Sequence, residues 1–150
     1  MALPPFQSLL DDHGPDVHHL LVGLLGQVEA DDAYQETFLA ALRAYPHVED
    51  TNLRGWLFTI AYRKATDTHR RRSRTVPMAD VPETGGPDTV TNNELWHAVE
   101  DLPPKQKAAV LHRYRDDWSY ERIADRLGTS APAARRNVHE GIKKLKESWR

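Results

Sequence analysis

The sequence predicts an all-α fold made of two small helical domains joined by a flexible linker. Apolar residues recur at helical spacing on both sides of residues 75–93, and strand-like alternation of apolar and polar residues is absent from the sequence. Residues 75–93 themselves contain three prolines and two glycines and have no helical period. The predicted boundaries are therefore residues 1–74 for the first domain, 75–93 for the linker and 94–150 for the second domain.

The first predicted helix covers residues 17–28. Apolar residues follow the i, i+3, i+4 rule over three turns there, at Val17, Leu20, Leu21, Leu24, Leu25 and Val28. A second helix is predicted over residues 31–45, because Asp31 and Asp32 suit the positive end of a helix dipole and Pro46 ends the helical pattern. Its expected inner face consists of Tyr34, Phe38, Ala41, Leu42 and Tyr45.

The third predicted helix begins near Leu53 and ends in the basic run at residues 69–74. Its expected inner face consists of Leu53, Trp56, Leu57, Ile60, Ala61 and Ala65. Trp56 has the chemistry to stack on a nucleic-acid base, but its place in the apolar stripe favours a core role. Residues 46–52 between the second and third helices are polar and are predicted to form an exposed loop.

Helical periodicity resumes in the second domain with Leu95, Val99 and Leu102. A further helix is predicted after Pro103 and Pro104. Its expected apolar residues are Ala108, Val110, Leu111 and Tyr114.

Residues 118–145 predict two short helices joined by a tight glycine turn. Ser119 and Ser130 are suited to cap the two helices, and Gly128 provides the left-handed backbone that ends the first one. Ile123, Ala124 and Leu127 are expected to be buried, whereas Arg135, Arg136 and His139 are expected to project from the second helix. This layout is typical of a DNA-reading helix-turn-helix, although an ordinary helical hairpin with solvated arginines has the same pattern.

Composition excludes several classes of function. The 150 residues include no cysteine, which excludes disulfides, thiolate zinc sites and cysteine nucleophiles. The longest apolar run is far too short to span a bilayer, and no signal peptide is recognisable. We therefore expect a cytoplasmic protein without membrane insertion and without a cofactor.

Charge is distributed unevenly although the net charge is only −2. Residues 11–50 contain nine acidic residues and a single arginine, whereas residues 63–74 contain six basic residues and one aspartate. Residues 132–150 contain six basic and two acidic residues. Two separate basic segments suit two contacts with one polyanion, and the acidic segment suits a basic protein partner. Each of these runs taken alone is also compatible with a solvated helix face.

Each half of the chain contains two further motifs. The first half contains D-D-A-Y-Q-E-T-F at residues 31–38 and W-L-F-T-I-A at residues 56–61, followed by a basic cluster. The second contains D-L-P-P-K-Q-K-A-A-V-L at residues 101–111 and W-S-Y-E-R-I-A-D-R-L-G at residues 118–128. Together these motifs resemble a bacterial RNA polymerase sigma factor of the extracytoplasmic-function (ECF) type in the sigma-70 family. The resemblance covers most of the chain and includes the order of the motifs and the position of the linker.

This resemblance implies a transcription initiation factor without catalytic activity. Its first domain would bind core RNA polymerase and melt the minus-ten promoter element, and its second would read the minus-thirty-five element as duplex DNA. An anti-sigma factor or another regulatory protein is also an expected partner. The implied polymerase-binding residues lie at helical spacing opposite the Tyr34–Phe38 face: Asp31, Asp32, Gln35, Glu36, Leu39 and Arg43.

The implied DNA contacts fall into two sets. Melting requires polar groups for an unstacked base and cations for the freed backbone. The minus-ten set is His47, Asp50, Thr51, Asn52, Arg54, Arg63, Lys64, Arg70 and Arg71. The minus-thirty-five set is Ser130, Pro132, Ala133, Arg135, Arg136, His139 and Lys143. Arginine pairs with guanine in bidentate fashion, so Arg135 and Arg136 are the expected base readers. Arg113, Arg115, Lys144 and Lys146 suit phosphates or water.

The sequence also departs from the family pattern. Pro132, Ala133 and Ala134 stand where the second helix of the motif usually opens with a Gly-Thr-Val type of sequence. Glu140 and Lys107 stand where arginine is usual, and Arg63 where asparagine is usual. These departures concern which promoter sequence is read and leave the class of partner unchanged.

Two other classes of function are compatible with parts of the sequence. A helix-turn-helix regulator that works without polymerase explains the second domain equally well, but it gives no reason for the motifs of the first. A helical metalloenzyme is suggested by His13, His18, His19 and neighbouring aspartates. Because adjacent histidines on a helix point in different directions and no His-Glu-x-x-His motif exists, we expect no metal site.

Overall fold

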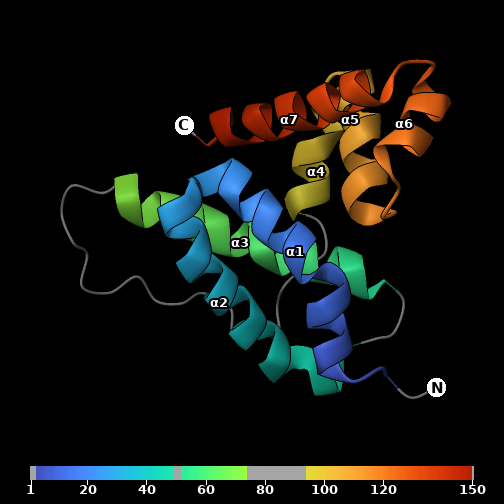
Figure 1. Ribbon diagram of the computed structural model, residues 1–150. Helices are drawn as coiled ribbons and strands as arrows, with labels where there is room; N and C mark the ends of the chain where they lie inside the picture. The colour runs from blue at the N-terminus through green and yellow to red at the C-terminus, as the bar shows by residue number, and fades with distance from the viewer. Residues whose placement is uncertain (1–2, 49–51, 74–93, 150) are drawn as a thin grey trace. The chain divides into compact units, whose positions relative to one another are not determined.

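The computed structural model describes residues 3–48, 52–73 and 94–149. Every regular element in these ranges is helical, which confirms the all-α class (Figure 1). The chain divides into two compact units, residues 1–92 and 93–150, and each is described by itself. Residues 74–93 fall outside the described ranges, so the linker and the domain boundaries remain predictions.

The first unit contains α1 (Phe6–Leu25), α2 (Gln27–Ala44), the 3-10 helix η1 (Tyr45–His47) and α3 (Leu53–Ser73). Each of the three long helices packs against the other two (Figure 1). Their shared core contains Val17, Leu20, Leu21, Leu24, Phe38, Ala41, Leu57, Phe58, Ile60 and Ala61. The unit is thus a three-helix bundle.

Helix α1 is longer than predicted and ends earlier. It begins at Phe6 rather than near residue 17, and it ends at Leu25 because Gly26 adopts a left-handed φ of 84°. The prediction that Val28 continues the apolar stripe of this helix is wrong, since Val28 belongs to α2 and is 86% exposed. The glycine restarts the helical phase, which places Val28 on the solvent side.

Helix α2 begins at Gln27, four residues before the predicted start. Phe38, Ala41 and Tyr45 are buried as predicted, but Leu42 is 52% exposed. The alanines of α2 explain why Leu42 is exposed. Small side chains let α1 and α3 approach closely, and the buried face is centred on them rather than on Leu42: Ala30, Ala33, Ala41 and Ala44.

Helix α3 begins at Leu53 as predicted. The Oδ1 atom of Asn52 accepts a hydrogen bond from the backbone N–H of Gly55 at 2.9 Å, which caps the helix. Leu57, Ile60, Ala61 and Ala65 are buried as predicted. Leu53 and Trp56 are half-buried, and the Trp56 ring lies 6.3 Å from that of Tyr45.

The second unit contains α4 (Glu94–Glu100), α5 (Pro104–Val110), the π-helical turn η3 (Leu111–Arg115), α6 (Tyr120–Leu127) and α7 (Ala131–Glu147). Helix α7 packs against α4, α5 and α6 (Figure 1). A Cβ atom at Gly141 would lie 2.6 Å from the Cγ2 atom of Val110, so glycine permits the close approach of α5 and α7.

The helix predicted after Pro104 is confirmed, with a shift in its buried face. Val110 and Tyr114 are buried as predicted. Ala108 and Leu111 are only half-buried, and Ala109 is fully buried instead, because Ala109 and Val110 lie on the side of α5 that faces α7. Of the helices described, none is both long enough and apolar enough to cross a bilayer.

Candidate nucleic-acid and protein-binding surfaces

Local chemistry fixes the helix-turn-helix of the second unit. The side chain of Ser119 accepts a hydrogen bond from the backbone N–H of Arg122 at 3.2 Å, and Ser130 accepts one from Ala133 at the same distance. Gly128 has φ 68° and ψ 40°, and its N–H donates to the carbonyl of Ala124. The predicted caps and turn are therefore confirmed, and they set the directions of α6 and α7.

Helix α7 separates an apolar face from a basic one. Its buried residues are Ala134, Val138, Gly141, Ile142 and Leu145. Arg135, His139 and Lys143 follow one another at intervals of four residues and are exposed, as is Arg136. Ser130 and Pro132 are exposed at the start of the helix, and Ala133 is half-buried. The structure thus brings the predicted duplex-reading residues to one surface.

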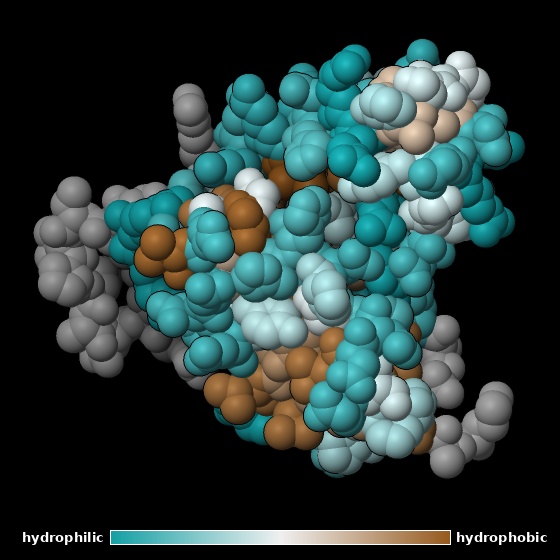
Figure 2. Space-filling view, viewed as in Figure 1, coloured by the Kyte–Doolittle hydropathy of each residue, from teal (hydrophilic) through white to brown (hydrophobic). Residues whose placement is uncertain are grey.

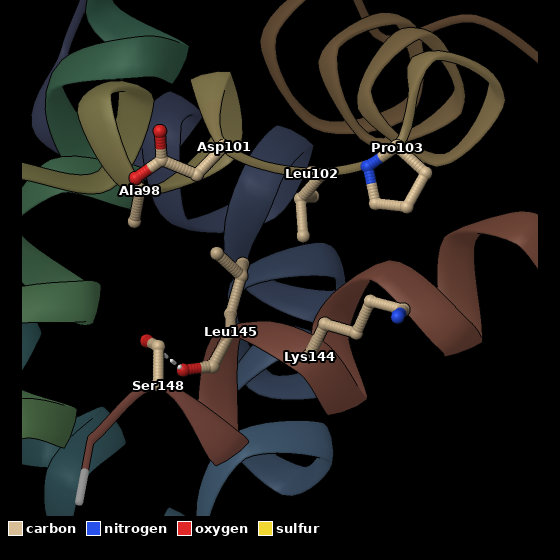
Figure 3. A pocket seen from close by; sticks show the side chains of 7 residues that line it. All are labelled: Ala98, Asp101, Leu102, Pro103, Lys144, Leu145 and Ser148. Carbon is tan, nitrogen blue, oxygen red and sulfur yellow. Dashed lines mark hydrogen bonds between the residues drawn. The ribbon is translucent and has the colours of Figure 1, made fainter.

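A groove lies at the other end of α7, between this helix and α4 with the turn after it (Figure 3). It is lined by Ala98, Asp101, Leu102, Pro103, Lys144, Leu145 and Ser148. Leu102 and Leu145 point toward one another across it (Figure 3). Lys144 is nine positions after Arg135 in the helix, which corresponds to roughly 14 Å along the axis. The groove therefore lies away from Arg135 and Arg136, although it adjoins Lys143 at the end of the basic face.

The exposed side of α2 carries the predicted protein-binding residues. Asp31, Asp32, Gln35 and Arg43 are exposed, Glu36 is half-buried, and Leu39 is 55% exposed. Leu42 and Val28 lie on the same side of the helix by helical geometry, and the sequence analysis missed both. Three large apolar residues on an acidic helix face favour a protein partner over solvent alone.

One edge of α2, next to its exposed side, is anchored to α1. The Nε2 atom of His18 lies 2.8 Å from Oδ1 of Asp31, and the rings of His18 and Tyr34 meet edge to face at 5.4 Å. Burial raises the pKa of the Tyr34 hydroxyl, which therefore stays neutral at physiological pH.

The basic end of α3 lies beside α2. Arg71 Nη2 lies 3.8 Å from Glu36 Oε2, and Arg72 donates a hydrogen bond to Glu29. Arg70 Nη1 lies 3.8 Å from Asp67 Oδ1 within the same helix. Arg70 and Arg71 are exposed, whereas Arg63 and Lys64 are half-buried. The predicted melted-strand cations thus occur together on α3, and two of its arginines pair with the acidic helix.

The loop before α3 is partly described. His47 and Asn52 are exposed, but the Oδ1 atom of Asn52 is used as a helix cap. Asp50 and Thr51 lie outside the described residues.

Arg54 has a different environment from the one that the sequence led us to expect. Its side chain is 6% exposed; Nη2 lies 2.9 Å from Asp16 Oδ2, and Nη1 lies 3.1 Å from His13 Nδ1. The guanidinium also lies 4.9 Å from the centre of the Phe58 ring. Because the Arg54 side chain is enclosed by α1 and α3, it is not placed to contact phosphate.

Two histidines of α1 contact charged side chains. His13 approaches Arg54, a cation, and His18 pairs with Asp31. Within residues 3–48, 52–73 and 94–149, no group of three or more His, Cys, Asp or Glu side chains is placed to hold a metal ion.

The visible faces of the two units differ in hydropathy. Figure 2 shows apolar patches on the first unit over α1 and α2, whereas the visible face of the second unit is mainly hydrophilic.

Comparisons with known proteins show which families the two parts of the chain match. The chain matches the sigma-70 region 2 family over residues 9–75 and the sigma-70 region 4 family over residues 92–145. It is 31% identical to the RNA polymerase sigma factor CarQ of Myxococcus xanthus, over 97% of this chain and 90% of CarQ. It is also 31% identical to the ECF RNA polymerase sigma factor SigE of Mycolicibacterium smegmatis, over 97% of this chain and 62% of SigE.

One similar solved structure is the sigma factor RpoE in complex with the anti-sigma factor NepR from Bartonella quintana, at 22% identity and a TM-score of 0.47. That alignment covers 95% of this chain and 94% of RpoE. The two family matches occur in chain order, and the likeness to CarQ extends over nearly the whole length of both proteins. The chain therefore belongs to the ECF group of sigma-70 family RNA polymerase sigma factors.

Proposed function

We propose that this chain binds core RNA polymerase and directs it to specific promoters. The exposed side of α2 docks on the polymerase, with Leu39 as an apolar anchor and the charges of Asp31, Asp32, Glu36 and Arg43 setting orientation. One observation carries this proposal: the same chain combines an acidic helix face bearing exposed leucines with a capped helix-turn-helix whose arginines are exposed.

The two DNA contacts are divided between the units. Arg70 and Arg71, together with Arg63, Lys64 and the loop containing His47 and Asn52, hold the melted minus-ten element. The start of α7 enters the major groove of the minus-thirty-five element, with Arg135 and Arg136 reading bases. His139 and Lys143 extend the same contact along the groove. Catalysis belongs to the polymerase in this scheme, and the chain supplies recognition.

A regulatory protein such as an anti-sigma factor is a further proposed partner. The exposed side chains of Val28, Leu39 and Leu42 support this proposal, because an inhibitor covering them would compete directly with polymerase.

The alternative is a helix-turn-helix regulator that works without polymerase. Co-purification of the full chain with core RNA polymerase at low salt separates the two functions. We expect a stoichiometric complex, and failure to form one would favour the regulator. The double substitution Arg135→Ala with Arg136→Ala is expected to abolish upstream duplex recognition while polymerase binding persists. Loss of polymerase binding in that variant would contradict the division between the units.

A further inference from the structure

Tyr120 lies between two arginines of the helix-turn-helix. The guanidinium of Arg135 on α7 is 4.9 Å from the centre of the Tyr120 ring, and that of Arg113 on η3 is 5.0 Å from it. Both distances fall within the range of cation–π attraction. The two guanidinium carbons are therefore no more than about 10 Å apart, which is comparable with the Debye length at physiological salt.

Arg113 is held in place by the turn before α6. Its Nη1 atom donates a hydrogen bond to the backbone carbonyl of Trp118 at 3.2 Å and lies 3.9 Å from Oδ1 of Asp117. The Arg113 side chain is 23% exposed, whereas that of Asp117 is 54% exposed. The carboxylate of Asp117 offsets part of the repulsion between Arg113 and Arg135. These contacts hold Arg113 against the Tyr120 ring, which makes a structural role for Arg113 more suitable than contact with phosphate.

Both ends of the Tyr120–Arg135 contact are fixed by helix caps. Tyr120 is the first residue of α6, directly after the cap Ser119, and Arg135 lies in the second turn of α7 after the cap Ser130. A long arginine side chain on a helix surface loses considerable rotamer entropy when it binds a base. A ring that already restricts Arg135 reduces this loss, because fewer conformations remain to be ordered.

We propose that Tyr120 is a positioning residue that holds the guanidinium of Arg135 in place for reading duplex DNA. This inference rests on the proposed function of Arg135 as a base reader. It predicts that removal of the ring weakens the base preference that Arg135 provides by about two- to fivefold, which is the effect of one exposed cation–π contact. The base preferences of other side chains on α7 are expected to stay unchanged.

Three substitutions distinguish positioning from general stability. Tyr120→Leu removes the ring, and Tyr120→Phe keeps it. Trp118→Leu is the matched control, because Trp118 is a second ring in the same segment that stacks on His112 and Arg122 at 4.0 Å each without contacting α7 in these interactions. Thermal unfolding of all three variants reports the loss of stability separately.

The experiment uses the full chain bound to core RNA polymerase and a library of duplexes randomised in the upstream promoter region. Arg135→Ala first identifies the base pair that Arg135 reads. We expect Tyr120→Leu to relax the preference at that same base pair, and Tyr120→Phe and Trp118→Leu to retain it. In the Arg135→Ala background, Tyr120→Leu should have no further effect on selectivity.

Three results would overturn the inference. The first is an equal loss of affinity for all duplexes with Tyr120→Leu, and the second is relaxed selectivity with Tyr120→Phe. Both leave Arg135 as a base reader and remove only the role of Tyr120. The third is an unchanged base preference with Arg135→Ala, which would remove the proposed role of Arg135 together with the inference built on it.

Discussion

Arg54 on α3 and Asp16 on α1 form an ion pair of 2.9 Å between Nη2 and Oδ2, and the arginine side chain is 6% exposed. This pair joins two helices whose partners lie 38 residues apart in the sequence. The Arg54 guanidinium also contacts the His13 imidazole and lies 4.9 Å from the centre of the Phe58 ring. Arg54 Nη1 donates to His13 Nδ1, so the imidazole carries its proton on Nε2. The positive residue that opens α3 therefore stabilises the three-helix bundle.

Substitution Arg54→Met should lower the free energy of unfolding by about 3 kcal/mol, because Asp16 loses its ion pair with Arg54 in a largely enclosed position. Urea unfolding measures this loss. The double variant Arg54→Met with Asp16→Leu should recover much of it, since both charged members of the ion pair are then replaced by apolar side chains. If the Arg54→Met variant is stable but fails to bind melted DNA, Arg54 contacts DNA after all and the structural role is contradicted.

Leu39→Ser should weaken binding to core RNA polymerase by roughly tenfold, which corresponds to the apolar area that a half-exposed leucine still has to bury. Stability should change by less than about 0.5 kcal/mol, because the side chain faces solvent. Val28→Ser, at the N-terminal end of the same helix face, is the comparison, and we expect it to weaken binding less than Leu39→Ser does. Titration with fluorescently labelled chain measures both affinities. Equal effects of the two substitutions would argue against Leu39 as the anchor.

Arg71→Gln should reduce the salt dependence of single-stranded DNA binding. The slope of log K against log salt should become shallower by about 0.7, the value for one lost phosphate contact on a single strand. The complex with core polymerase and a single-stranded oligonucleotide of mixed sequence provides the measurement. Arg72→Gln is the control, because Arg72 is bonded to Glu29 and lies outside the proposed contact set. An unchanged slope with Arg71→Gln would remove Arg71 from the DNA surface.

Asp117 has a positive φ of 60°, a conformation that costs free energy for any residue with a Cβ atom. Asp117→Gly and Asp117→Ala both remove the exposed carboxylate near Arg113, and only the first removes the Cβ atom. We expect the glycine variant to be more stable than the alanine variant by about 1 kcal/mol. Thermal unfolding measures the difference. Equal stability of the two variants would show that the turn relaxes without cost.

The stability of the second unit is expected to depend on pH through Asp116, whose carboxylate contacts His112 and Arg115 of η3. Burial by itself raises the pKa of this carboxyl, but hydrogen bonds from His112 at 2.9 Å and Arg115 at 3.2 Å outweigh burial and hold the pKa below its ordinary value. A lowered pKa in the folded state contributes stability above the unfolded-state value near 3.9, and that contribution is lost as pH falls through the folded-state pKa. Asp116→Asn should flatten this part of the stability profile below about pH 4. Thermal unfolding of both proteins across this pH range measures the effect, and coinciding stability profiles of Asp116→Asn and the parent chain would contradict the prediction.

The features that the sequence predicted well depend on neighbouring residues. Ser119, Gly128 and Ser130 act on the backbone within a few positions of themselves, so the helix-turn-helix follows from local chemistry. The exposed residues of α2 followed from helical spacing because their neighbours Phe38 and Ala41 mark the buried side.

The features that the sequence analysis missed depend on residues distant in the chain. Burial of Arg54 requires the placement of α1 against α3, and a basic residue in a basic helix gives no sign of it. Leu42 was placed inside by spacing alone, whereas the packed alanines of α2 turn it outward. The contact of Tyr120 with Arg135 joins two helices across a turn, and the order of residues alone does not bring the two side chains together.

Run-off transcription with core RNA polymerase on a library of genomic promoters tests the central claim most directly. We expect initiation at a defined set of start sites when this chain and core polymerase are both present, and none with either component alone. The Arg135→Ala, Arg136→Ala variant should lose these start sites while it still occupies the polymerase. Absence of any promoter-specific transcript, together with failure of the chain to bind core polymerase at low salt, would contradict the account.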